Sequence, residues 1–495
     1  SHTESRKRRA DEPLDEYSLA KRAKVVLEAP SDLSKSENYE ALQEMPSERI
    51  LDDCPVADED IPPLPLLYRG FGLFIDIYNG NDNIPELKHI DHAGLEIAVY
   101  KFAASMAGFF RDDDARRVEG LRHLNSIFAA RTTKAPQFTG IRAESLGRYR
   151  TDGNDRAPHD AAATVVKFQK ELTGNDTLPE VEVTCSVAQL NVSAKKMGLL
   201  FNSWRVPCLG ITVVGPQVTF YGVLSLGHRY RLVSLTPTLS CLGSDLETNR
   251  YKSLIRSFTA ASVLNILISR DAANLLDHLP SPIEPDCLRL PAIHRLRKWH
   301  APGPSADTTN TPSDNDYVEF HIMNKSSTQP TSLLYVAQMD NRAIIVRFTQ
   351  TYSCDVHAFC ATRGHAPNLL AYERLPGGWI GIAMEFVNNP TRLAAAFQAA
   401  SPDKRQGWRV DLRALVQELH EEDLVLGDFR AANIVVDDQG RIMLVDFDWG
   451  GRDGRVAYPT WCLDPELTNG RLAKDLIIRK CDDVRVLEAT LSSMP

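Results

Sequence analysis

The chain has 495 residues, a hydrophobic content of 43% and a formal net charge of −9. This length and composition predict two or three domains with sizeable cores, and the acidic balance argues against a chain that binds nucleic acid along its whole length. Its 9 cysteines include no C-x-x-C pair, and neither a long apolar run nor a signal-peptide pattern occurs, which argues against a disulfide framework, a zinc site, secretion and a membrane span.

Residues 1–60 form a polar segment without apolar periodicity. Such a segment cannot offset the entropy of ordering, so we expect a disordered tail. Two basic clusters lie within it, KRR at 7–9 and KRAK at 21–24, and their spacing resembles a bipartite nuclear localisation signal, whose extended peptide is held by an import carrier. The alternative is a solvated run of charges. The signal predicts a nuclear or nucleocytoplasmic protein with an import carrier as partner.

Residues 61–300 have the pattern of an α+β domain. Apolar positions at helical spacing, with a capping box before Pro179, predict helices over 94–109, 115–130, 177–201 and 251–279. Apolar and β-branched runs predict a strand over 163–168 and a meander over 208–214, 218–226 and 229–235. The basic run RLRK at 295–298 predicts a helix. It leaves nucleic-acid binding open, although such a run is more often a solvated helix face.

Residues 301–316 are rich in Pro, Ser, Thr and Asp and predict a linker. Residues 317–495 predict a further domain. Its expected strands lie at 318–323, 332–338, 341–348 and, as a hairpin pair, within 378–387. Its expected helices are 354–363, 410–419 and one or two after residue 451.

The stretch 424–451, LVLGDFRAANIVVDDQGRIMLVDFDWGG, carries the chemistry of this domain. Its two apolar runs, at 434–436 and 442–445, flank a turn of the Asp-x-x-Gly type and therefore predict a β-hairpin. Asp428 and Asn433 precede the hairpin and Asp446 follows it, so we expect these three side chains to converge. Two carboxylates and an amide oxygen suit a hard cation such as Mg²⁺. An ordinary hairpin with solvated turn acids is the alternative.

The run GDFRAAN at 427–433, followed by LVDFD at 444–448, resembles the catalytic loop and metal-binding segment of the protein-kinase-like fold. The resemblance implies that ATP and Mg²⁺ are the cofactors, that Asp428 accepts the proton of the substrate hydroxyl, and that Asn433 and Asp446 hold the metal. Gly-Asp and Asp-Phe-Asp stand where protein kinases have Arg-Asp and Asp-Phe-Gly. These variants look more like aminoglycoside-phosphotransferase-type and fungal kinase-like domains, including those of crinkler-type multidomain proteins.

The same resemblance places the nucleotide. Arg347 stands where the template has a phosphate-binding lysine, and Asp355 is its candidate partner. Ser326 and Ser327 lie in a phosphate-covering hairpin that lacks glycine. The segment from Glu385 to Val387 resembles the hinge that binds adenine through its backbone.

The order strand, helix, meander in residues 61–300 is similar to the nuclease-like domain of some crinkler-type proteins. That family needs an acid and a Glu-x-Lys on neighbouring strands to bind metal and activate water. Here the strand continues as KFQKE from Lys167, without that order, so we expect a degenerate domain without nuclease activity. An α+β domain of unrelated ancestry remains the alternative.

Two functions follow from the sequence. The first is an ATP- and Mg²⁺-dependent phosphotransferase that acts on a protein or small-molecule hydroxyl. The second is a catalytically weak or inactive pseudokinase that serves as a nuclear interaction or effector module with an unknown protein partner. Asp428, Asn433 and Asp446 favour the first, whereas Arg347 and the missing glycines favour the second.

Overall fold

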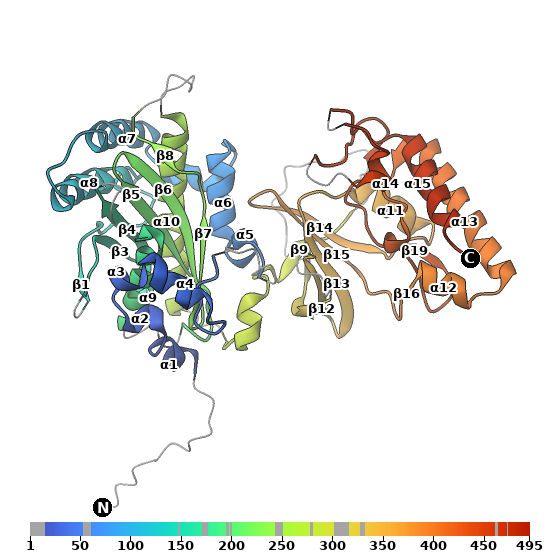
Figure 1. The fold of residues 1–495 in the computed structure, drawn as a ribbon, viewed down its shortest axis with the longest axis horizontal. Helices are drawn as coiled ribbons and strands as arrows, with labels where there is room; N and C mark the ends of the chain where they lie inside the picture. Colours follow the sequence, from blue (N-terminus) through green and yellow to red (C-terminus); the bar gives the residue numbers. More distant parts are fainter. Residues whose placement is uncertain are drawn as a thin grey trace, which may run out of the picture. The chain divides into compact units, whose positions relative to one another are not determined.

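The computed structural model describes residues 15–52, 61–146, 149–170, 177–194, 198, 200–242, 251–277, 281–300, 316–326, 332–460, 464–472 and 474–495. The chain divides into two compact units, Ser1–Ala292 (unit 1) and Ile293–Pro495 (unit 2) (Figure 1). Both units combine helices with β-sheets, so the protein is of mixed α+β class. The second unit begins before the predicted linker, of which residues 301–315 lie outside the described residues.

Unit 1 is built on a sheet in the order β3-β4-β5-β6-β7, with β8 also paired to β6. Its strands are β3 (Gly153–Arg156), β4 (Ala162–Gln169), β5 (Val206–Val214), β6 (Gln217–Leu226), β7 (Arg229–Ser234) and β8 (Leu239–Ser240). β4 and β5 are parallel because helix α9 (Pro179–Ser193) crosses between them, and the other pairs are antiparallel. A separate hairpin pairs β1 (Ser145–Leu146) with β2 (Tyr149–Arg150). The predicted strand and meander are confirmed.

Helices cover both faces of this sheet (Figure 1), and β5 is accordingly buried at every position. The first face packs against α5 (Leu64–Leu67), α6 (Arg69–Tyr78), α7 (His92–Met106), α8 (Asp113–Phe128) and α10 (Lys252–Asp277). The second face packs against α9 and the N-terminal helices. Successive β4 residues divide between the faces, with Val166 in the first core and Val165 in the second.

The expectation of a disordered tail is wrong for residues 15–52. This segment forms α1 (Glu16–Ala20), α2 (Lys24–Leu27), α3 (Pro30–Leu33) and α4 (Ser36–Gln43). Val25, Leu33 and Leu42 are buried in the core around α9, and Glu16 accepts hydrogen bonds from the backbone and ring of His228 at 2.8 and 2.7 Å. Each helix is too short to show periodicity in the sequence. The basic cluster at 7–9 lies outside the described residues.

Four other predictions for residues 61–300 are wrong. The helix expected to reach residue 201 ends at Ser193, and its N-cap residue Leu178 makes no side-chain capping bond, so the capping box does not form. Val118, one of the apolar positions at helical spacing that predict the helix over 115–130, is 61% exposed. The basic run at 295–298 is not helical, because β9 (Arg295–Arg297) pairs with β10 (Tyr317–Glu319) within unit 2.

After the β9–β10 pair, unit 2 continues with an antiparallel sheet in the order β11-β12-β13-β15-β14. Its strands are β11 (His321–Lys325), β12 (Leu334–Met339), β13 (Arg342–Thr349), β14 (Leu369–Leu375) and β15 (Trp379–Glu385). Helix α11 (Cys354–Thr362) lies between β13 and β14 in the sequence and packs into the helical part of the unit through Val356 and Cys360. These elements confirm the predicted helix and the strands expected at 332–338 and 341–348. The strand expected at 318–323 is divided between β10 and β11, which belong to different sheets. The pair expected within 378–387 is wrong, because that segment forms the single strand β15, whose hairpin partner β14 precedes it.

The helical part of unit 2 comprises α12 (Leu393–Ala399), α13 (Pro402–Glu421), α14 (Pro465–Thr468) and α15 (Lys480–Ser492). The hairpin of β18 (Ile434–Val436) and β19 (Ile442–Leu444) and the strand β17 (Leu424–Val425) contribute to their core. The more exposed strands β16 (Thr391–Arg392) and β20 (Gly451–Arg452) pair with β18 and β17. The sequence did not predict α12. Within the described residues, no helix combines the length and apolar character needed to cross a membrane.

Candidate active site

The loop that carries Asp428 leaves β17 through a tight turn at Gly427. Gly427 has φ +83°, and a Cβ there would lie 3.1 Å from Ile478 and 3.3 Å from the Trp449 backbone, so a larger residue would be strained. The backbone N–H groups of Leu426 and Gly427 donate to the two carboxylate oxygens of Asp483 at 3.0 and 2.7 Å. The turn is therefore held by a side chain from α15.

Asp483 is an anchor that the sequence did not reveal. It is fully buried, and burial raises the pKa of its carboxyl, while bonds from His420 and from the two loop N–H groups lower it. Tyr458 adds a second anchor, because its hydroxyl donates to the carbonyl of Gly427 at 2.7 Å. The partners of both side chains are backbone groups of a distant loop, and no sequence motif marks such groups.

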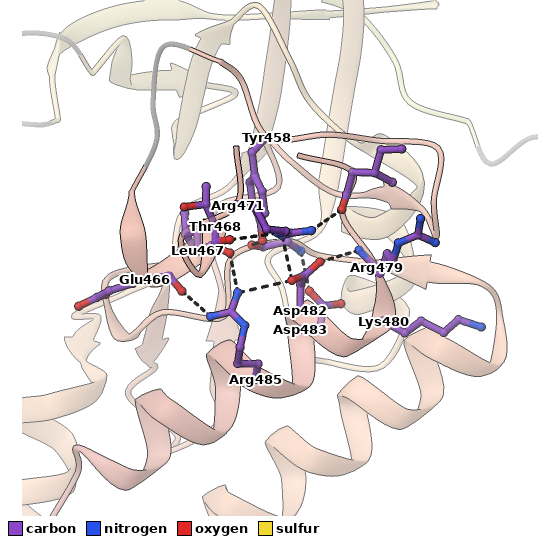
Figure 2. Close-up of polar contacts among 12 residues, drawn as sticks. Tyr458, Glu466, Leu467, Thr468, Arg471, Arg479, Lys480, Asp482, Asp483 and Arg485 are labelled. Carbon is purple, nitrogen blue, oxygen red and sulfur yellow. Dashed lines mark hydrogen bonds and ion pairs between the residues drawn. The ribbon is translucent and has the colours of Figure 1, made fainter. Parts of the chain in front are cut away.

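Figure 2 shows the polar network that fixes the start of α15 next to Asp483. Arg471 donates to the carboxylate of Asp482 at 2.9 Å and to the carbonyl of Thr468 at 3.0 Å. Arg485 donates to the carbonyl of Glu466 at 2.7 Å. These bonds join α14 to α15, so the helix that presents Asp483 is itself held in place.

Asp428 is buried and forms a two-pronged ion pair with Arg430. Nε and Nη2 of Arg430 donate to the two oxygens of Asp428, each at 2.7 Å, which is a strong geometry for an arginine and a carboxylate. The remaining nitrogen of Arg430 pairs with Asp464, the N-cap residue of α14. The sequence marked Asp428 but gave Arg430 and Asp464 no role.

Asn433 and Asp446 lie at the same end of the β18–β19 hairpin. Ile434 pairs with Leu444, and the N–H of Val445 donates to the carbonyl of Asn433 at 3.1 Å. The side-chain amide of Asn433 donates to the carbonyl of Asp428 at 3.4 Å. Its oxygen accepts no hydrogen bond from a described residue and can therefore bind a cation. The hairpin thus brings Asp428, Asn433 and Asp446 into one region.

This donor set fits Mg²⁺. Within the described residues, no group of three or more His, Cys, Asp or Glu side chains is arranged to hold a metal ion. A metal here would use the carboxylate of Asp446, the amide oxygen of Asn433, phosphate oxygens and water, which matches the partial protein shell that Mg²⁺ takes in nucleotide sites.

Arg347 on β13 contacts two carboxylates of the segment 446–448, which follows the hairpin. Its Nη1 lies 3.2 Å from Oδ1 of Asp446, and its Nη2 lies 2.6 Å from Oδ2 of Asp448. Burial lowers the pKa of Arg347, but Asp446 and Asp448 raise it by more, so the net shift is upward and the guanidinium stays charged. The suggested partner Asp355 is wrong, because Arg347 bonds Asp446 and Asp448 instead.

Asp448 is a further residue that the sequence left without a role. Burial, together with the neighbouring Asp446, raises its pKa to about 7 against the opposing charge of Arg347. Thr349 also donates to Oδ2 of Asp448 at 3.3 Å. The sequence did contain one sign of a special role, because position 448 is a carboxylate where the kinase template has a glycine.

The residues proposed to bind nucleotide are placed as follows. Ser326 is exposed at the end of β11, and Ser327 lies outside the described residues. The N–H of Glu385 donates to the carbonyl of Asn368 at 3.0 Å, so this group is already engaged. No described residue hydrogen-bonds to the backbone of Val387, which leaves its N–H and carbonyl open to a ligand.

His357 supports the segment 446–448 by stacking on Phe447. The two rings stack with centroids 4.4 Å apart, and the imidazole lies between the Tyr352 hydroxyl at 2.6 Å and the Pro367 carbonyl at 2.7 Å. Since a carbonyl only accepts, Nε2 carries the proton and Nδ1 accepts from Tyr352. Burial lowers the pKa of His357 to about 4, so the ring is neutral.

This arrangement predicts a pH-dependent stability. The folded pKa of about 4 lies below the ordinary value of 6.5, so the unfolded chain binds more protons between these values. The free energy of unfolding should therefore fall as the pH drops from 6.5 to 4, by about 3 kcal/mol at most. In His357→Gln, the free energy of unfolding should depend less steeply on pH than in the unchanged protein, as measured by thermal unfolding of both. Equal slopes would contradict the prediction.

In unit 1, Lys167 lies between two carboxylates. Its ammonium is 2.6 Å from Glu182 on α9 and 3.5 Å from Asp152, which precedes β3, and Arg117 approaches Asp152 at 3.8 Å. Burial lowers the pKa of Lys167, while the two carboxylates raise it. The sequence did not reveal either acid as a partner of Lys167, because Asp152 and Glu182 come from other elements than β4.

We still expect no metal-dependent nuclease activity from this cluster, because the ammonium occupies the space between the carboxylates and repels a metal ion. Incubation of the whole protein with plasmid DNA and Mg²⁺ or Mn²⁺ should leave the DNA intact. Cleavage that disappears in Glu182→Gln would show that the cluster is a hydrolytic site.

Comparison with known proteins gives a partial match. No protein-family model matches the chain, and no curated protein matches it. Among solved structures, the chain is similar to the kinase PK-1 of Cydia pomonella granulovirus, with 14% sequence identity and a TM-score of 0.30 over 35% of this chain and 67% of that one. A likeness at this TM-score assigns no role to a residue and supports no argument about activity.

Proposed function

We propose that unit 2 is an ATP- and Mg²⁺-dependent phosphotransferase of the protein-kinase-like fold, acting on a hydroxyl of a protein or a small molecule. The observation that supports this proposal most is the placement of Asp428, Asn433 and Asp446 around one hairpin, on a loop held by Asp483. In this fold an Asp accepts the hydroxyl proton, and an Asn with a second Asp holds the metal.

The chain's own residues then have distinct tasks. Oδ1 of Asp428 accepts hydrogen bonds from both Nε and the backbone N–H of Arg430, whereas Oδ2 accepts only from Nη2. Oδ2 therefore keeps a lone pair that can accept the proton of the substrate hydroxyl. Asn433 and Asp446 hold and orient Mg²⁺, which neutralises charge on the phosphates. The backbone of Val387 offers a donor and an acceptor to a base such as adenine.

The second candidate is a pseudokinase that serves as an interaction module. It is supported by Arg347, which is engaged by Asp446 and Asp448, and by the ion pair between Asp428 and Arg430. A protein with these contacts would keep the fold while binding nucleotide poorly.

Thermal unfolding with ATP, in the presence and absence of Mg²⁺, separates the two candidates. A nucleotide at 100 times its dissociation constant stabilises the folded state by about 2.7 kcal/mol, which gives a clear shift. We expect a shift that requires Mg²⁺, together with transfer of phosphate to an acceptor. A protein that shows neither would leave the interaction module as the better account.

We also propose a nuclear location, supported by the basic clusters at 7–9 and 21–24. The second cluster is folded, since Ala23 is buried and the N–H of Lys24 donates to Glu48 at 3.0 Å, whereas an import carrier takes an extended peptide. The cluster at 7–9 should therefore contribute more.

A fluorescent fusion of the whole chain tests this prediction. Alanine at all six basic positions should leave the fusion in the cytoplasm, and alanine at Lys7, Arg8 and Arg9 alone should have most of that effect. Alanine at Lys21, Arg22 and Lys24 is the matched comparison. A nuclear signal that is unchanged when all six are replaced would rule out the localisation signal.

A further inference from the structure

Arg347 and Asp448 depend on each other for charge compensation. Oδ1 of Asp448 is buried and has no hydrogen-bond partner among the described residues, so the carboxylate relies on the contacts of Oδ2. Oδ2 has two contacts, an ion pair with Arg347 at 2.6 Å and a hydrogen bond from Thr349 at 3.3 Å. Only the contact with Arg347 supplies a compensating charge. Removing one member of such a pair leaves an uncompensated buried charge.

The pair acts on Asp446. With Nη2 held by Asp448, the edge of the guanidinium faces Asp446, where Nη1 lies 3.2 Å from Oδ1 and Nη2 lies 3.3 Å from Oδ2. The backbone N–H of Asp448 also donates to Oδ1 of Asp446 at 3.1 Å. A lysine has a single nitrogen and cannot make this set of contacts, whereas the planar fork of arginine can.

We propose that Asp448 is a positioning residue: it orients Arg347 so that the guanidinium fixes the metal-binding carboxylate of Asp446, and Arg347 acts as an anchor of that carboxylate and not as a free phosphate ligand. This inference rests on the proposed phosphotransferase function. It explains together two departures from the kinase template, arginine at 347 and a carboxylate at 448, because each residue needs the other.

The experiment measures how much Mg²⁺ is needed for ATP to stabilise the whole protein against heat. Loss of a group that orients a metal ligand typically costs 10- to 100-fold in metal affinity. Asp448→Ala should therefore raise the Mg²⁺ concentration for half-maximal stabilisation about tenfold or more. Asp448→Asn, which keeps the size but removes the charge, serves as a second variant if the alanine variant folds poorly. Asp438→Ala removes an exposed acid of the same hairpin and is the matched control.

Arg347→Met distinguishes anchoring from direct metal binding by Asp448. If Arg347 and Asp448 act as one unit, Arg347→Met weakens the response to Mg²⁺, and the double variant is no weaker than Arg347→Met alone. If Asp448 binds the metal and Arg347 only competes with it, Arg347→Met strengthens the response. That strengthening, or an Asp448→Ala protein that behaves like Asp438→Ala, would overturn the inference and leave the proposed function intact.

A readout on the protein without nucleotide keeps the two proposals separate. Hydrogen exchange of the backbone amides at 446–450 should be faster in Asp448→Ala than in the unchanged protein and unaffected in Asp438→Ala, because the anchor exists before any ligand binds. If ATP and Mg²⁺ stabilise no form of the protein, the proposed function fails. Unchanged exchange in Asp448→Ala would then overturn the anchoring role as well.

Discussion

Replacing Asp446 with asparagine should abolish the Mg²⁺-dependent stabilisation by ATP. Asp446 and Asn433 lie at the same end of the β18–β19 hairpin. In the protein-kinase-like fold of the proposal, the metal supplies most of the charge that neutralises the phosphates. The variant keeps the size of the side chain but removes the anionic ligand. We therefore expect the thermal shift of about 2.7 kcal/mol at 100-fold excess nucleotide to disappear.

The control for Asp446→Asn is its effect on the ligand-free protein. The same change removes the charge that faces Arg347 at 3.2 Å, so the melting temperature without ligand has to be measured in parallel. A variant that remains folded and loses only the response to Mg²⁺ supports the metal role. A full Mg²⁺-dependent shift in the folded variant would show that the metal binds elsewhere.

The sequence predicted the hairpin and its flanking acids because both signals are local. The turn residues at 437–440 separate two short apolar runs, and β18 and β19 form there as expected. The strand from 341 to 348 and the meander of unit 1 were visible for the same reason. Each of these elements carries its pattern within about ten residues.

The partners of the site residues could not be predicted, because they are distant in the sequence. Asp483 binds backbone groups 56 and 57 positions away, and Arg347 pairs with Asp448 across 101 positions. Asp355 was suggested as the partner of Arg347 because it lies close to Arg347 in the sequence. Such pairings follow from how the sheet, the hairpin and α15 pack, which local propensity does not encode.

The N-terminal segment shows a different limit. Helices α1 to α4 contain between 4 and 8 residues, so none is stable alone. Single apolar residues such as Val25 and Leu33 order them by packing against α9. A composition that looks disordered is compatible with a folded segment when a neighbouring domain supplies the core.

The last prediction concerns Asp428, whose replacement should separate binding from transfer. If Asp428 accepts the proton of the substrate hydroxyl, Asp428→Asn should slow phosphate transfer by about 10²- to 10⁴-fold. The thermal shift with ATP and Mg²⁺ should change little, because Asp428 acts on the acceptor and not on the nucleotide. Asp428 also accepts two side-chain hydrogen bonds from Arg430, so displacement of this arginine is a second way in which Asp428→Asn can reduce transfer.

Asp464→Asn is the matched control for that effect, since it weakens the other attachment of Arg430 and leaves Asp428 intact. A small loss in Asp464→Asn beside a large loss in Asp428→Asn assigns the chemistry to Asp428. Equal losses would mean that Arg430 is the group that matters, and transfer at an unchanged rate in Asp428→Asn would exclude Asp428 as the base. Because Asp428 and Asp446 affect different steps, the two variants together test whether one site both binds the nucleotide and transfers its phosphate.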